Sequence, residues 1–236
     1  MKRALCFSLL FLSLMGYCSS VTKGSYYKWN DGGTHDLENM SWGSGRVSSH
    51  TTLNIKDNGR IESGALEVWD TSIVNIVGNG AYVPELRALS NSEINIANGT
   101  VGVFCTDFSC VNITGGQIRP ASGFSPYLYA HGSAEMHIYG GQFSGVFTSD
   151  QSASIIFHGS DFKINGLAVT PGEYFASDFT SGLLTGKLDS GALLNHNFTI
   201  SENASITLTP EPATLALLAL GGLALLRRKR ASQRKR

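Results

Sequence analysis

Residues 94–101 read INIANGTV, and this pattern decides the fold because it recurs along the chain. It consists of an apolar–polar–apolar triplet, a glycine and a second apolar residue. The third residues of successive triplets are separated by 21, 20, 17, 25 and 19 positions, so the period is close to 20, which is typical of a repeat architecture. The triplets are Leu53-Asn54-Ile55, Val74-Asn75-Ile76, Ile94-Asn95-Ile96 and Val111-Asn112-Ile113, with degenerate copies at 136–138 and 155–157.

Each copy of the repeat predicts short strands joined by tight corners. The triplet alternates apolar and polar residues, as a strand with one buried face does. A glycine follows within four residues and can supply the positive φ of a corner. The second apolar residue then begins another inward-facing strand; these residues are Ile61, Tyr82, Val101, Ile118, Phe143 and Phe162. Three strands in about 20 residues form one coil, and stacked coils bury a continuous core. We therefore expect an all-β parallel β-helix of about six coils, of either hand.

The middle residue of each triplet should point outward. This places Asn54, Asn75, Asn95 and Asn112 one above another, and His137 continues the row. Stacked amides can hydrogen-bond along such a ladder, which would stabilise the coil. The same row could instead form a flat ligand-binding strip. An antiparallel β-sandwich is the alternative fold, although the near-constant position of the corner glycine disfavours it.

The repeat also divides the chain into segments. We expect a signal peptide over 1–20, an N-terminal cap over 21–50, the solenoid over 51–166, a C-terminal β cap over 167–208 and a terminal signal over 209–236. The caps are expected because an open coil exposes sheet edges. Tyr26, Tyr27, Trp29 and Trp42 precede the first triplet and are the residues expected to cover that end.

The C-terminal segment has three parts in a fixed order. Pro210-Glu211-Pro212 comes first, an apolar run over 213–226 comes second, and the basic cluster Arg227, Arg228, Lys229 and Arg230 follows. This order resembles the PEP-CTERM sorting signal of proteins exported by Gram-negative bacteria. The resemblance covers about a tenth of the chain. It implies that an exosortase, a membrane enzyme, recognises and processes the tail.

The apolar run is expected to insert in the inner membrane only transiently. Its 14 residues would reach roughly 21 Å as a helix, short of the roughly 30 Å hydrocarbon core. The basic cluster would stay on the cytoplasmic side. A plain C-terminal anchor that remains in the membrane is the alternative.

The N-terminus predicts export by the secretion machinery. Lys2 and Arg3 precede an apolar stretch from Leu5 to Met15, which is the pattern of a secretory signal helix. Cys18 suggests a lipoprotein site, but Tyr17 stands where such a site needs a small residue.

Removal of both signals changes the charge of the protein. The chain has 18 basic and 18 acidic residues, but Lys2, Arg3 and seven tail residues supply half of the basic ones. The rest of the chain then has nine basic and 18 acidic residues, for a net charge of −9. This balance disfavours nucleic acid as a partner and suits a protein exposed to an ionic medium.

Two cysteines remain in the body, Cys105 and Cys110. In an oxidising compartment this pair could form a disulfide, and two unpaired thiols are the alternative. No cluster of His and Cys completes a zinc site, so we expect no metal and no cofactor.

The sequence offers little support for catalysis. Glycoside hydrolysis needs two carboxyl groups across the scissile bond, and β-elimination needs a base. The candidates Glu135, Asp150 and Asp161, with His131, His137 and His158, are scattered over different coils, so we assign no catalytic residue. We expect an exported structural or adhesive protein of the cell surface or extracellular matrix, with exopolysaccharide as a partner. The alternative is a small carbohydrate-active or carbohydrate-binding β-helix protein.

Overall fold

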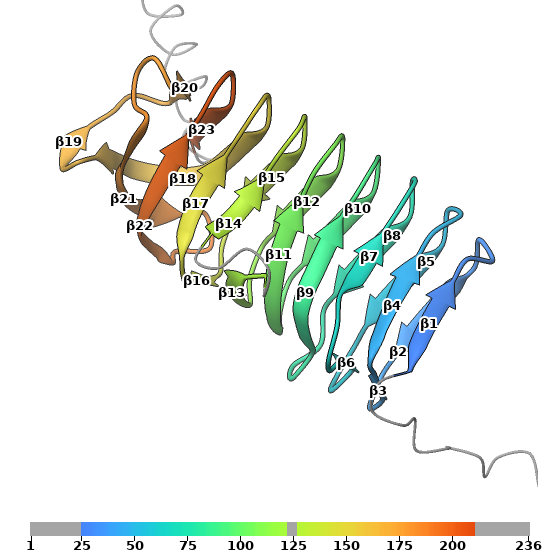
Figure 1. Ribbon diagram of the computed structural model, residues 1–236. Helices are drawn as coiled ribbons and strands as arrows, with labels where there is room; N and C mark the ends of the chain where they lie inside the picture. The colour runs from blue at the N-terminus through green and yellow to red at the C-terminus, as the bar shows by residue number, and fades with distance from the viewer. Residues whose placement is uncertain (1–24, 122–126, 211–236) are drawn as a thin grey trace, which may run out of the picture.

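The computed structural model describes residues 25–121 and 127–210, and the regular structure within them consists of β-strands. The chain winds into a β-solenoid of about six turns (Figure 1), which confirms the predicted fold class. Each complete turn places one strand on each of three faces. The predicted signal helix and the apolar helix over 213–226 lie outside the described residues. Within the two described ranges, no helix is long and apolar enough to cross a membrane.

The face built from the triplets, here called the ladder face, carries the main core column. Its strands pair in parallel and in register, so that Ile55, Ile76, Ile96 and Ile113 lie in one inner column. All four side chains are buried, as the alternation of the triplet predicts. The strands are β2 (Thr34–Leu37), β5 (Thr52–Ile55), β8 (Ile73–Ile76), β10 (Glu93–Ile96), β12 (Cys110–Ile113), β15 (Glu135–Ile138), the start of β18 (Ser154–Ile164) and β23 (Ser205–Pro210).

Two further faces complete each turn. The groove face consists of β3 (Ser41–Trp42), β6 (Arg60–Ile61), the first parts of β9 (Tyr82–Ala88) and β11 (Thr100–Cys105), β13 (Gln117–Pro120) and β16 (Gln142–Phe143). The third face consists of β1 (Tyr26–Trp29), β4 (Ser44–Val47), β7 (Leu66–Val68), the second parts of β9 and β11, β14 (Tyr127–Ala130), β17 (Val146–Ser149) and the end of β22 (Leu193–Ile200).

The solenoid begins one coil earlier than the repeat predicts. Residues expected to form only a cap over 21–50 contain β1, β2 and β3, which pair in register with β4, β5 and β6. The strand β2 reads THDL, with His35 opposite the apolar Leu53. Among the described residues this first coil pairs with a neighbouring coil on one side only, so its inward positions tolerate polar residues. For this reason the triplet pattern is lost there.

One inward assignment from the sequence is wrong. Tyr82 pairs with Arg60 and Thr100, which are the outward residues of their coils, and the inward position belongs to Val83 opposite Val101. The corner before β9 runs through Gly78, Asn79 and Gly80 and is longer than its neighbours, so counting from the triplet misplaces Tyr82 by one residue.

The C-terminal end of the solenoid is covered by antiparallel strands. β18 extends beyond the ladder face and pairs with β19 (Leu167–Ala168) and β21 (Ser181–Leu188), which in turn pairs with β22. The chain then returns to the stack, because β22 joins β17 and β23 joins β18 in parallel. β20 (Gly172–Phe175) covers the outer edge of β23. The segment predicted as a cap over 167–208 therefore also contributes the last two strands of the stack.

Candidate functional site

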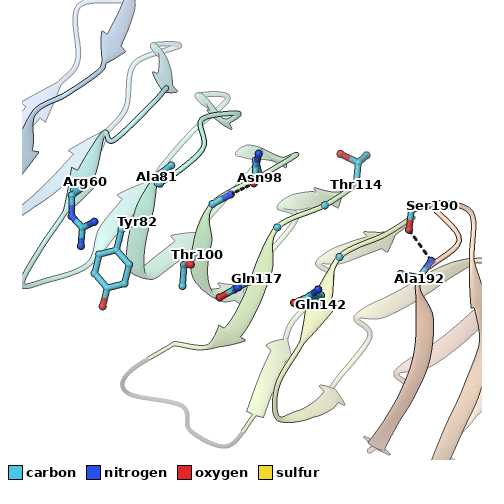
Figure 2. Close-up of a pocket in the computed structure, with 15 residues that line it drawn as sticks. Arg60, Ala81, Tyr82, Asn98, Thr100, Thr114, Gln117, Gln142, Ser190 and Ala192 are labelled. Carbon is cyan, nitrogen blue, oxygen red and sulfur yellow. Dashed lines mark hydrogen bonds between the residues drawn. The ribbon is translucent and has the colours of Figure 1, made fainter.

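A groove with a volume of about 580 Å³ follows the solenoid along the corner between the ladder face and the groove face (Figure 2). It extends from Arg60 on β6 to Gln142 on β16, and thus crosses five coils. Adjacent strands lie about 4.8 Å apart, so the four steps between these residues correspond to roughly 19 Å. Its length and straightness come from the regular stacking of the coils.

Glycines form the floor of the groove. Gly99 and Gly116 have φ values of +85° and +86°, which residues with a Cβ atom rarely adopt. A Cβ atom at Gly99 would lie 2.8 Å from the carbonyl oxygen of Ala81 in the preceding coil. The corner therefore requires glycine for its backbone and for the close approach of the next coil. Because these positions lack side chains, they leave a trough between two rows of residues that have them.

The first wall is the outward row of the groove face. It contains Arg60, Tyr82, Thr100, Gln117 and Gln142, which follow one another along the coils in Figure 2. The guanidinium of Arg60 lies 4.8 Å from the ring centroid of Tyr82, and its Nε donates to Glu62 at 2.8 Å. Arg60 therefore covers one face of the Tyr82 ring. On its other side Tyr82 pairs with Thr100, which also lines the groove.

The second wall combines polar residues of the corners with a hairpin that is distant in the sequence. Asn98 and Thr114 belong to the corners of successive coils. Ser190 and Ala192 come from the turn between β21 and β22, and the amide of Ser190 donates to the carbonyl oxygen of Tyr139 at 2.9 Å. The cap thus closes one end of the groove, and the wall is complete only when the C-terminal part of the chain has folded onto the coils.

The groove is polar but nearly uncharged. Among its described lining residues Arg60 is the single formally charged side chain, and none is a carboxylate. Hydroxyl and amide groups dominate, and both can donate and accept hydrogen bonds. This surface can bind a hydroxyl-rich ligand, but it holds no pair of groups for general acid and base catalysis.

The predicted asparagine row is a continuous hydrogen-bonded column on the ladder face. The amide nitrogen of Asn75 donates to Asn54 at 2.8 Å, that of Asn95 donates to Asn75 at 3.0 Å, and that of Asn112 donates to Asn95 at 2.9 Å. Asn54 donates to Asp36 of the first coil at 2.8 Å. The pKa of Asp36 is lowered by its hydrogen bonds from Lys56 and Asn54. The amides therefore satisfy one another along the stack.

Two of the candidate histidines, His137 and His158, lie at the C-terminal end of the same face. His137 Nε2 lies 3.2 Å from Glu135, and His137 Nδ1 lies 3.3 Å from His158 Nε2. His158 Nδ1 lies 2.8 Å from the hydroxyl of Thr209 on β23. Burial, assisted by the charge of His137, lowers the pKa of His158 to about 4. His158 is therefore neutral near pH 7 and links the last coils.

Asp150 joins the coils on the third face. It accepts hydrogen bonds from the hydroxyls of Tyr129 and Ser201, both at 2.7 Å, and these bonds lower its pKa. His131 Nδ1 lies 3.5 Å from the same carboxylate. The remaining candidate acid, Asp161, is exposed on β18. Within residues 25–121 and 127–210, no group of three or more His, Cys, Asp or Glu residues is arranged to hold a metal ion.

Of the two alternatives that the sequence left open for Cys105 and Cys110, the structure has two free thiols and no disulfide between them. Cys105 is the last residue of β11 and is buried in the core, whereas Cys110 begins β12 in an outward position opposite Glu93 and Glu135. The two thiols therefore lie on opposite sides of the coil wall. Burial raises the pKa of both, and most strongly that of Cys105.

The start of the terminal signal is part of the fold. Leu208 is buried in the core, and the hydroxyl of Thr209 donates to the carbonyl oxygen of Phe157 at 3.1 Å. Pro210 is still in register with Gly159 of β18. The other residues predicted for the signal, from Glu211 to Arg230, lie outside the described part of the chain. The folded body thus extends to the first residue of the Pro-Glu-Pro motif.

Sequence reasoning missed the groove. A signal was present, since three of the corner glycines are followed directly by polar residues in the pairs Gly99-Thr100, Gly116-Gln117 and Gly141-Gln142. The contribution of Ser190 and Ala192 had no such signal.

Comparison with known proteins identifies the tail. The family model of the PEP-CTERM protein-sorting motif matches residues 208–230. No curated protein and no solved structure matches the chain. The match begins on the last strand of the solenoid, at Leu208, and agrees with the segment recognised from the sequence.

Proposed function

We propose that this PEP-CTERM protein is exported, processed at its tail by an exosortase-type enzyme, and has a structural or adhesive role at the cell surface or in the extracellular matrix. The observation that carries this proposal is the overlap of the sorting motif with β23. The motif starts at Leu208 and β23 ends at Pro210, so a cut beyond Pro210 would release a chain that keeps every described strand of the solenoid.

The membrane contact is proposed to be transient. Residues 213–226 would hold the protein in the inner membrane while the enzyme acts, and the basic residues that follow would face the cytoplasm. The released body would carry most of its charge as carboxylates, which favours solubility outside the cell.

A binding role is preferred over a catalytic one. A glycosidase needs two carboxyl groups about 5 to 10 Å apart at the bond that it cleaves. The described residues of the groove include no carboxylate, and Asp150 is tied to Tyr129 and Ser201 on a different face. These facts support a binding surface. If the protein acts on carbohydrate at all, they favour a carbohydrate-binding protein over a carbohydrate-active enzyme.

Intact-mass measurement tests the processing. We expect the protein isolated from the surface of its native cells to lack Arg236 and the rest of the basic cluster. The variant Pro212→Ala should remain full length and stay with the membrane fraction, whereas Gln233→Ala, beyond the matched motif, should be processed normally. A surface protein that retains Arg236 would contradict the proposal.

The role of the body is tested by deleting the gene. Cells without the protein should form a weaker matrix or adhere less, and the wild-type gene should restore the property. Unchanged adhesion and matrix mass, with normal export in the parent strain, would contradict a structural or adhesive role.

A further inference from the structure

We infer that the groove binds an uncharged polysaccharide chain lying parallel to the solenoid axis, with Tyr82 as the stacking residue and Thr100, Gln117 and Gln142 as hydrogen-bonding residues. This inference rests on the proposed adhesive role and gives it a ligand. It concerns the groove alone and is independent of the tail.

The chemistry of the first wall fits a sugar chain. The Tyr82 ring is apolar on its face and polar at its hydroxyl, so it can pack against the C–H face of a pyranose and still bind water or a sugar hydroxyl. Thr100, Gln117 and Gln142 present groups that both donate and accept, as sugar hydroxyls do. Within the described chain, the side chains of Thr100 and Gln142 make no hydrogen bond, so these groups are available to a ligand.

The geometry of the groove fits a polymer better than a single sugar. Equivalent wall positions recur once per coil, about every 4.8 Å, which is similar to the length of one sugar residue in an extended chain. The floor of Gly99 and Gly116 allows close approach over several coils. The volume of about 580 Å³ lies within the usual range of ligand sites.

The charges favour a neutral polymer over an anionic one. Arg60 is the one cation among the described lining residues, and it is already engaged by Glu62 and by the ring of Tyr82. The net charge of −9 between the two signals would repel an acidic polysaccharide.

A peptide is a poorer fit because it would need a free strand edge. The groove-face strands β6, β9, β11 and β13 each pair with a strand on both sides, so their backbone groups are not available for strand addition.

Affinity electrophoresis of the exported protein tests this inference. Native gels would contain hydroxyethylcellulose, dextran, galactomannan or xyloglucan as neutral probes, and alginate as an anionic probe. We expect at least one neutral polymer to retard the protein, with an affinity unchanged in about 0.5 M NaCl, where exposed charges are screened. Retardation by alginate alone, lost in salt, would overturn the inference, as would no retardation by any neutral polymer.

Variants locate the site. Tyr82→Ala should weaken binding at least tenfold, while Tyr26→Ala, which removes a 51% exposed tyrosine from the third face, should leave it unchanged. If Tyr82→Ala fails to fold, the double variant Gln117→Ala/Gln142→Ala removes two exposed side chains and should weaken binding at least fivefold. Equal affinity of the groove variants and Tyr26→Ala would overturn the inference. Such a result would leave tail processing untouched, because that is measured separately by intact mass.

Discussion

At the scale of single residues, the corner glycines combine a backbone requirement with a packing requirement. Gly99 and Gly166 have φ values of +85° and +81°, but only Gly99 lies beneath another coil. Gly99→Ala should lower the free energy of unfolding by about 2–4 kcal/mol, because it adds a clash with the Ala81 carbonyl to the backbone strain.

Gly166→Ala is the matched control for this prediction. A Cβ atom at Gly166 would meet nothing within 4 Å, so the variant should lose only about 1 kcal/mol through backbone strain. Urea unfolding of both variants measures the difference. Equal losses would show that close stacking at the corner contributes nothing.

The lowered pKa of His158 predicts how the stability of the fold depends on pH. Its pKa in the fold is about 4, below the ordinary value of 6.5, so between pH 6.5 and 5 the unfolded chain binds a proton that the folded protein does not. Stability is therefore full above pH 6.5 and falls as the pH falls, by about 1 kcal/mol at pH 5 after allowance for the partial solvent exposure of the ring.

Thermal unfolding between pH 7 and 5 checks this slope. His158→Gln should flatten it but not abolish it, because burial also lowers the pKa of His196. The carboxylates with lowered pKa values take up protons below pH 5, outside the range measured here. A variant with the same slope as the wild type would contradict the role assigned to His158.

At the scale of elements, the asparagine column links neighbouring strands of the ladder face. Asn95→Ala removes the donor to Asn75 and the acceptor for Asn112. Because these amides are half-buried and water can reach them, we expect a loss of about 1–2 kcal/mol in the free energy of unfolding. Asn91→Ala, in an exposed turn, should lose less than about 0.5 kcal/mol.

A double-mutant cycle between Asn75 and Asn95 separates the hydrogen bond from general effects of truncation. We expect a coupling energy of at least about 0.5 kcal/mol. Additive losses would mean that the column merely lies in register and that its amides do not stabilise the stack.

The same elements show which parts of the fold a sequence can predict. The triplets place Ile55 and Asn75 correctly, because alternation along a strand determines which side of the coil wall each residue faces. Prediction from the triplets fails where the repeat changes, as at the longer corner before Tyr82 and in the first coil. The spacing of Cys105 and Cys110 says nothing about pairing until the strands place them on opposite faces.

At the scale of the whole molecule, the groove shows why a site can escape sequence analysis. One wall comes from consecutive coils, but Ser190 and Ala192 reach the other through a hairpin that follows the coils in sequence. The same C-terminal region brings β23 back to the stack and ends at the sorting motif. The same end of the solenoid therefore completes the wall of the groove and carries the start of the sorting motif.

The core, the asparagine column and the groove all require coils that stack in register along a single axis. Thr34, Glu93 and Glu135 occupy one outward column, with Glu93 three coils and Glu135 five coils from Thr34. In the exported protein, without residues 1–20 and their two cysteines, spin labels on Thr34 paired with Glu93, and on Thr34 paired with Glu135, can be introduced after Cys105→Ala and Cys110→Ser. Double electron–electron resonance then gives both distances. The stacked coils predict that the second mean distance exceeds the first by two strand spacings, about 10 Å; equal distances, or a shorter second distance, would contradict stacking of the coils in register.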